Sequence, residues 1–230
     1  MTESVGNVVP EDAPLGAALL AAVAVMDRLR SPGGCPWDAE QTHASLAPYL
    51  LEEAYEAFQA IEDGDLTSLR DELGDVLLQV LFHARLAEEL PAEQRWTIDD
   101  VASGLVAKLE RRHPHVFGDV SVSGADEVNR NWEQIKAEER GDKSPVASVP
   151  LSAPALTLAA KLQRKSGIAP SVDPAVVVDA VDEFKRDPSA ATAGELLWTA
   201  VAVMRGNGID AEAALRAHAR AFRDQILAEG

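Results

Sequence analysis

Apolar and polar residues recur along most of the chain with the period of α-helices. Leu19, Val23 and Met26, for example, follow one another at intervals of four and three residues, which places their side chains on one face of a helix. No stretch shows the two-residue alternation of a β-strand at convincing length. The sequence therefore predicts an all-α fold. Its first helices are expected at about residues 15–30, 48–63, 66–90, 98–113 and 126–140.

Proline, glycine and serine residues divide this helical pattern. Residues 31–41, SPGGCPWDAEQ, contain prolines and glycines that forbid a continuous helix, so we expect a loop there. Pro48 fits the first turn of the helix that follows. The sequence thus predicts four segments: a disordered leader over 1–13, a first helical domain over 14–141, a linker over 142–154 and a second helical unit over 155–230.

The second unit is expected to be a degenerate copy of part of the first. Residues 191–205 repeat the pattern of residues 71–85, including a glycine followed by an acidic residue at the same place. Thr192, however, stands where the first copy has Glu72. A duplicated all-helical unit that keeps its helices and loses some of its acidic residues explains this pattern.

Two acidic clusters are embedded in consecutive helices of the first domain. Glu52, Glu53 and Glu56 lie within one turn of one helix, and Glu72 and Asp75 lie within one turn of the next. Residues at these spacings share one helix face. An acidic turn containing a glycine separates the helices, so the simplest geometry is an antiparallel pair whose carboxylates face each other.

Carboxylates placed so closely repel one another unless a cation neutralises them. Oxygen ligands without cysteine or a set of histidines select a hard cation, so we expect Mg²⁺, with Mn²⁺ as the alternative. The simpler interpretation is a solvent-exposed helix face. Apolar neighbours such as Leu51, Phe58 and Leu73 weaken that interpretation, because they bring the acids close to the contact between two helices.

Composition narrows the class of protein. A chain of 230 residues with 47% apolar content can form one or two globular domains. Its net charge of −17 argues against binding to nucleic acid, which needs a cationic surface. The single cysteine, Cys35, suits a reducing cytoplasm. The apolar run over 15–26 is too short to span a membrane and follows no basic residue, so we expect no membrane association.

A basic cluster ends the predicted fourth helix. Lys108, Arg111 and Arg112 lie in its last turns, where cations complement the negative end of the helix dipole. The same cations could instead bind the phosphate groups of a ligand.

Five motifs follow one another between residues 17 and 140. They are Gly34-Cys35-Pro36-Trp37-Asp38-x-x-Gln41-Thr42, Pro48-Tyr49-x-Leu51-Glu52-Glu53-x-x-Glu56, Glu72-Leu73-Gly74-Asp75, Lys108-Leu109-Glu110-Arg111-Arg112-His113-Pro114-His115-Val116-Phe117 and Trp132-Glu133-x-Ile135-Lys136. Together they resemble the MazG family of nucleoside triphosphate pyrophosphohydrolases. A lone Glu-Glu-x-x-Glu is common in amphipathic helices, but five motifs in this order form a specific signature.

The resemblance implies an all-α helical bundle that forms a homodimer. It implies Mg²⁺-dependent cleavage of NTPs or dNTPs between the α and β phosphates, giving a nucleoside monophosphate and pyrophosphate, as in the house-cleaning of nucleotide pools. It also assigns residues. Glu53, Glu56, Glu72 and Asp75 match the metal ligands, Glu52 matches an additional acid, Lys108, Arg111 and Arg112 match the triphosphate-binding cluster, and Trp132 and Lys136 match a segment near the nucleotide.

Several alternatives remain open at this level. Glu52 is the candidate general base, and Glu53 is the alternative. Trp132 could pack in a core or interface instead of contacting nucleotide. The substrate could be narrower, such as dUTP or phosphoribosyl-ATP. The rival function is a non-catalytic helical module that binds metal or nucleotide and regulates a partner; the complete acidic set of the first copy favours the enzyme.

Overall fold

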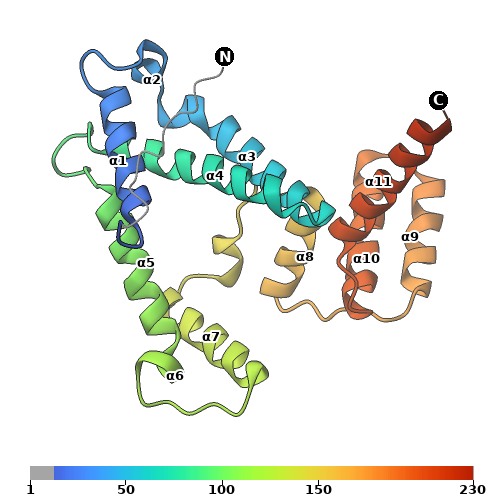
Figure 1. Ribbon diagram of the computed structural model, residues 1–230. Helices are drawn as coiled ribbons and strands as arrows, with labels where there is room; N and C mark the ends of the chain where they lie inside the picture. The colour runs from blue at the N-terminus through green and yellow to red at the C-terminus, as the bar shows by residue number, and fades with distance from the viewer. Residues whose placement is uncertain (1–12, 230) are drawn as a thin grey trace. The chain divides into compact units, whose positions relative to one another are not determined.

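The computed structural model describes residues 13–229, which form two compact units that meet at Val128 and Asn129. The predicted leader therefore lies outside the described residues, apart from Ala13. Every regular element of the described chain is helical (Figure 1), so the predicted all-α fold is confirmed. None of these helices is both long and apolar enough to cross a membrane.

The first unit contains six helices in the described chain and the start of a seventh. They are α1 (Ala17–Arg30), α2 (Pro36–Glu40), α3 (His43–Asp63), α4 (Leu66–Ala87), α5 (Ile98–Arg112), α6 (Pro114–Phe117) and the beginning of α7 (Ala125–Arg140). Two local predictions were wrong. The expected loop over 31–41 contains α2, which has Pro36 at its first position, and Pro48 lies inside α3 because that helix begins earlier, at His43.

Strong local signals define the antiparallel pair of α3 and α4. The Thr42 hydroxyl accepts a bond from the Ser45 N–H, and the Ser45 hydroxyl oxygen accepts one from the Thr42 N–H, which caps α3. Gly64 ends α3 with a left-handed φ of 69°. Asp65 then caps α4 by accepting bonds from two backbone N–H groups, and these bonds lower the pKa of its carboxyl. The two helices lie side by side (Figure 1).

The buried core of the first unit lies where α1, α3 and α4 meet. Met26, Leu46, Leu81, Phe82 and Leu86 form it. Side chains at the start of α5 and along α1 pack against this cluster. Burial of these apolar side chains is the main stabilising contribution, and it fixes α4 relative to α1.

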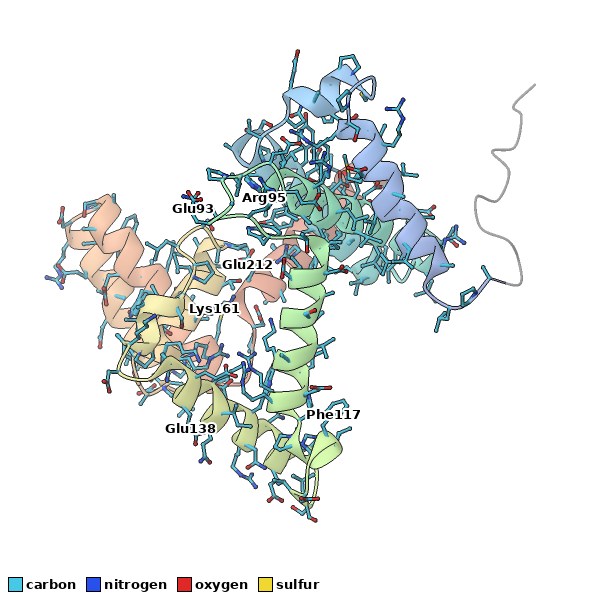
Figure 2. All side chains as sticks on the ribbon, turned by 90° about the vertical axis from the view of Figure 1, so that its left-hand side faces the viewer. Glu93, Arg95, Phe117, Glu138, Lys161 and Glu212 are labelled. Atoms are coloured by element: carbon cyan, nitrogen blue, oxygen red, sulfur yellow. The ribbon has the colours of Figure 1, made fainter. Side chains whose placement is uncertain are left out.

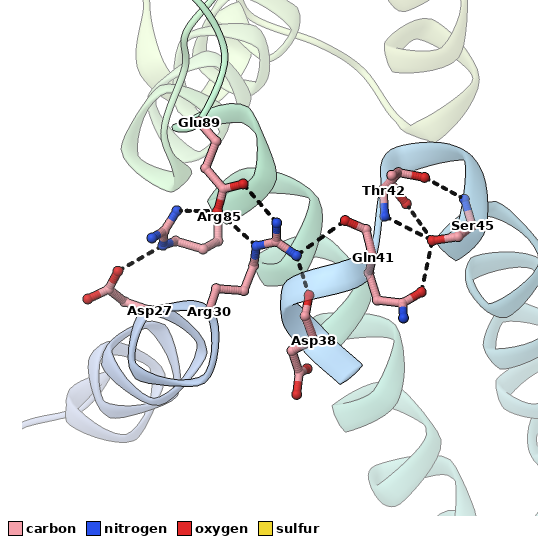
Figure 3. A network of polar contacts seen from close by, with 8 residues as sticks. All are labelled: Asp27, Arg30, Asp38, Gln41, Thr42, Ser45, Arg85 and Glu89. Atoms are coloured by element: carbon pink, nitrogen blue, oxygen red, sulfur yellow. Dashed lines mark hydrogen bonds and ion pairs between the residues drawn. The ribbon is translucent and has the colours of Figure 1, made fainter. Parts of the chain in front are cut away.

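One buried arginine connects three helices of this unit (Figure 3). The Arg30 side chain of α1 is only 5% exposed, and its guanidinium donates to both carboxylate oxygens of Glu89, just after α4, at 2.9 and 2.7 Å. It also donates to the backbone carbonyls of Asp38 and Gln41, at the end of α2. The same group lies over the ring of Phe82. Arg30 therefore fixes the chain between α1 and α3.

The second unit contains the rest of α7, the 3₁₀ turn η1 (Pro145–Ser148) and four further helices. These are α8 (Ala155–Lys165), α9 (Ala175–Arg186), α10 (Ala190–Gly206) and α11 (Ala211–Glu229). The helices α9 and α10 pack together, and α8 and α11 contact α10. Gln163 and Val201 are among its fully buried side chains.

We expect Arg30→Ala to lower the free energy of unfolding by about 3 kcal/mol, because two backbone carbonyls lose their donor and Glu89 loses one partner. Urea titration followed by circular dichroism measures the change. Arg70→Ala is the control, since Arg70 is 78% exposed and pairs only with its neighbour Asp71 in the described chain; its effect should stay below about 0.5 kcal/mol. Equal losses in the two variants would contradict this role for Arg30.

The difference in unfolding free energy between wild type and Arg30→Ala should depend on pH. Hydrogen bonding to Arg30 lowers the pKa of Glu89 below its usual 4.5. The stabilisation that the ionised Glu89 provides is therefore fully present above that usual pKa. It is lost as the pH falls through the lowered pKa. The difference in stability between wild type and Arg30→Ala should narrow on acidification.

Candidate active site

The antiparallel pair of α3 and α4 brings acidic side chains of both helices together. Glu53 and Glu56 of α3 and Glu72 of α4 each offer a carboxylate oxygen, and these three atoms lie within 4.8 Å of one another. Glu53 and Glu72 are half-buried, whereas Glu56 is exposed. We call these three residues the acidic group. Within residues 13–229 no other set of three acidic, histidine or cysteine side chains comes as close.

The other two predicted acids lie at the edge of this group. Glu52 and Asp75 are exposed, and the negative charges of both raise the pKa of Glu53. Three of the four predicted metal ligands thus gather at one point, and Asp75 lies within electrostatic range of that point. Their roles as ligands stay a prediction.

Burial and mutual repulsion disfavour the charged form of this group. Partial burial is the largest cause that raises the pKa of Glu53, followed by the charges of Asp75, Glu56, Glu52 and Glu72. Partial burial also raises the pKa of Glu72, followed by the charge of Glu56 and a hydrogen bond with it. Within the described residues, every charge that shifts these two pKa values is negative, so the repulsion is not offset there.

A divalent cation fits this donor set. The group supplies only carboxylate oxygens, the ligands that hard cations prefer, and a bound cation would remove the repulsion that raises the two pKa values. The acidic group can therefore hold a divalent metal ion.

The predicted basic cluster does not lie beside these acids within the chain. Lys108, Arg111 and Arg112 occupy the last turns of α5. Ile98, at the start of α5, packs against the core, but α5 then runs away from α3 and α4 (Figure 1). Its basic end consequently lies apart from the acidic group of the same chain.

The predicted nucleotide segment makes contacts of its own in the second unit. The Lys136 ammonium lies 3.5 Å from the ring centroid of Trp132 and 3.2 Å from a carboxylate oxygen of Glu133. Lys165 of α8 also pairs with Glu133, at 3.4 Å. These ion pairs and hydrogen bonds lower the pKa of Glu133, with the Lys136 bond as the largest cause. The packing interpretation of Trp132 gains support from these contacts.

Known proteins resemble this chain over most of its length. The model of the MazG nucleotide pyrophosphohydrolase domain matches residues 41–117. A nucleoside triphosphate pyrophosphohydrolase of Escherichia coli (strain K12) is 42% identical over 213 residues, which cover 84% of this chain and 79% of the relative. This chain belongs to the MazG family. The predicted family and enzyme class, a nucleotide pyrophosphohydrolase, are thus confirmed.

Two further relatives cover the second unit as well. A protein of Thermotoga maritima named nucleoside triphosphate pyrophosphohydrolase/pyrophosphatase MazG is 41% identical over 216 residues, 89% of this chain and 82% of the relative. An uncharacterized 26.1 kDa protein of Streptomyces cacaoi is 47% identical over 217 residues, 93% of this chain and 83% of the relative. The segment that matches the MazG domain contains the acidic group and the basic cluster, but ends before Trp132 and Lys136.

Sequence reasoning missed a pair of histidines beside the core. The Nδ1 atoms of His43 and His83 lie 2.7 Å apart, the rings are stacked, and Trp96 stacks on His43. One Nδ1 must donate and the other accept, so the two rings cannot both be doubly protonated without losing this bond. Burial is the main cause that lowers the pKa of His83. The residues are forty positions apart in sequence, and no local pattern links them.

We expect Glu72→Gln to raise the melting temperature in metal-free buffer at neutral pH. The raised pKa of Glu72 means that its charged form opposes folding. The difference in melting temperature between Glu72→Gln and wild type should disappear as the pH falls through that raised pKa, because the wild-type side chain is then protonated. Thermal unfolding in EDTA at several pH values measures both effects.

Added MgCl₂ should raise the melting temperature of wild type and have a smaller effect on Glu72→Gln, because the variant has lost one ligand of the acidic group. Glu93→Gln is the matched control: Glu93 is exposed and lies in the loop before α5. It should behave as wild type. An identical Mg²⁺ effect in wild type and Glu72→Gln would contradict a metal site at Glu72.

Proposed function

We propose that this chain hydrolyses nucleoside triphosphates to nucleoside monophosphates and pyrophosphate, with Mg²⁺ held by Glu53, Glu56, Glu72 and Asp75. The observation that carries the proposal is the acidic group itself, in which carboxylate oxygens from consecutive helices lie within 4.8 Å. It lies inside the segment that matches the MazG domain. The names of the relatives from Escherichia coli and Thermotoga maritima support the substrate class.

Each group of side chains would have one role in this reaction. A divalent cation bound to the acidic group would neutralise phosphate oxygens of the substrate. Glu52 is exposed beside that group and would accept a proton from the attacking water, with Glu53 as the alternative base. Lys108, Arg111 and Arg112 would hold the leaving pyrophosphate, where negative charge accumulates.

The working protein would be a homodimer. Leu51 of α3 and Leu73 of α4 are 55% and 53% exposed, and Leu77 and Phe58 beside them are also exposed. An apolar cavity of about 460 Å³ is lined by residues of α1 and α4, among them Val25 and Leu78. Apolar surface of this kind is typical of an interface between copies. A second copy would cover it and would bring its own basic cluster to these acids.

The segments of the chain would then differ in role. Residues 14–141 would form the catalytic domain, residues 142–154 a linker and residues 155–230 a degenerate copy. In that copy Lys185 pairs with Asp182 and Arg186 with Glu183, so these acids are already neutralised. The net charge of −17 and the nucleotide substrate suit a cytoplasmic enzyme that cleans the nucleotide pool and does not bind nucleic acid.

We expect Glu53→Gln and Asp75→Asn to lower the rate of Mg²⁺-dependent pyrophosphate release from a panel of NTPs and dNTPs by about 100-fold or more, because each removes a charged ligand. Glu195 of the second unit aligns with Asp75 of the first, and Glu195→Gln should keep full activity. Circular dichroism confirms folding of each variant. Nucleotide binding without pyrophosphate release in wild type would instead support a regulatory module.

Mixing two inactive variants tests the shared site. Glu53→Gln removes an acid, and Lys108→Gln weakens the basic cluster. In a mixed dimer one site combines the intact acids of one chain with the intact basic cluster of the other. Co-refolding the variants should therefore restore about a quarter of the wild-type activity, the statistical share of intact sites in random dimers. If both clusters of a site came from one chain, no site in the mixture would be intact and activity would not return.

A further inference from the structure

The second unit contains a cavity of about 420 Å³ whose charged lining is mostly cationic. Lys161 and Arg164 of α8 and Arg205 of α10 line it, together with the turn that leads into α11. We call this the cationic cavity. All of its lining residues lie between 157 and 211, within one compact unit.

A fully buried glutamine holds Arg205 in place. The Gln163 amide nitrogen donates to the Trp198 carbonyl at 2.8 Å, and its oxygen accepts from Nη1 of Arg205 at 2.9 Å. Gln163 has no exposed surface. The backbone at Gly206, the next residue, packs closely against Ser171: a Cβ at Gly206 would lie 2.1 Å from the Ser171 carbonyl oxygen. The orientation of the Arg205 guanidinium is therefore set before any ligand arrives.

The other two cations have no acidic partner in the described chain. Lys161 and Arg164 lie three residues apart and so share one face of α8; Figure 2 labels Lys161 on that helix. No ion pair of either residue occurs within residues 13–229. Both side chains are therefore available to bind an anion.

The far wall of the cavity adds hydrogen-bond donors. Asp210 and Ala211 line it at the start of α11. Asp210 uses one carboxylate oxygen to cap the Ala213 N–H at 3.0 Å. The amides of the first helical residues before Ala213 are left for another acceptor, as at every helix start. Asp210 is also the one acid among the lining residues, and the three cations outnumber it.

We propose that the cationic cavity binds a small oligophosphate anion, recognised through its phosphate groups alone. Three cations and a helix start match two or three linked phosphates, and the volume lies within the range of small-molecule sites. Lining side chains other than the charged ones are small or aliphatic, such as Thr157, Ala160 and Ile209, and none is aromatic. A nucleoside base would therefore find no stacking partner in this cavity.

Helix dipoles alone do not explain this arrangement. Arg164 and Arg205 lie in the last turns of α8 and α10, where cations are favourable. Lys161 lies a turn earlier in α8, however, and a dipole role requires neither a common cavity nor the buried Gln163 that orients Arg205. A purely electrostatic role for these residues predicts lower stability on substitution and no anion binding.

Calorimetric titration of the full chain with sodium pyrophosphate, in EDTA, tests the proposal. We expect saturable binding to wild type and at least about a tenfold rise in Kd for the double variant Lys161→Gln, Arg164→Gln. Lys185→Gln, which removes an exposed cation of the same unit, should bind as wild type. Arg164 is exposed and Lys161 is half-buried, so circular dichroism is used to confirm that the double variant folds.

Further ligands define what the cavity recognises. Inorganic phosphate should bind more weakly than pyrophosphate, and ADP should bind no more tightly. The proposal would be overturned by absence of binding to wild type, by retained affinity in the double variant or by loss of affinity in Lys185→Gln. Binding of phosphate as strong as that of pyrophosphate, or tighter binding of ADP, would also overturn it. The titration contains no free metal ion and measures no turnover. A negative result therefore leaves the proposed hydrolysis untouched.

Discussion

Repulsion among the carboxylates of α3 and α4 is the constraint that the first unit is built around. Two capped helices joined at Gly64 and Asp65 are forced side by side, and the acids of both face the same point. The folded chain tolerates this crowding because burial of the Met26 and Phe82 cluster and the bonds of Arg30 hold α4 in place. The raised pKa values of Glu53 and Glu72 show that their charged forms are destabilised. A cation bound by these carboxylates would relieve the repulsion, and this relief would favour its binding.

The helices were predictable because their signals are local. The apolar residues recur with the helical period, and the residues that end a helix lie next to it in sequence. Gly64 directly follows α3, and Thr97 directly precedes α5. The short α2 was not predictable, because Arg30 holds its end from another helix. The early start of α3, by contrast, has a local signal, because Thr42 and Ser45 form a capping box before Pro48.

The candidate site, too, contains parts that local sequence determines and parts that depend on distant residues. The acidic group could be predicted, because helix spacing and one short turn determine where Glu53, Glu56 and Glu72 lie. The position of the basic cluster could not, because it depends on the direction that α5 takes after leaving the core. The contact between Trp132 and Lys136 is local, yet nothing in the spacing of two residues distinguishes packing from contact with a nucleotide.

The two units show how one helical pattern can support opposite ligand charges. In the first, carboxylates from two helices gather, and the charges that raise the pKa of Glu53 are all negative. Without a bound cation they would repel an anionic substrate. In the second, Thr192 stands where the sequence pattern of the first unit has Glu72, and its hydroxyl completes the capping box of α10. Asp182 is paired within its own helix. Lys161 and Arg164, which line the cationic cavity beside Arg205, form no ion pair within residues 13–229, so they can contact phosphate directly. The second unit thus presents cations to a ligand, whereas the first unit presents carboxylates.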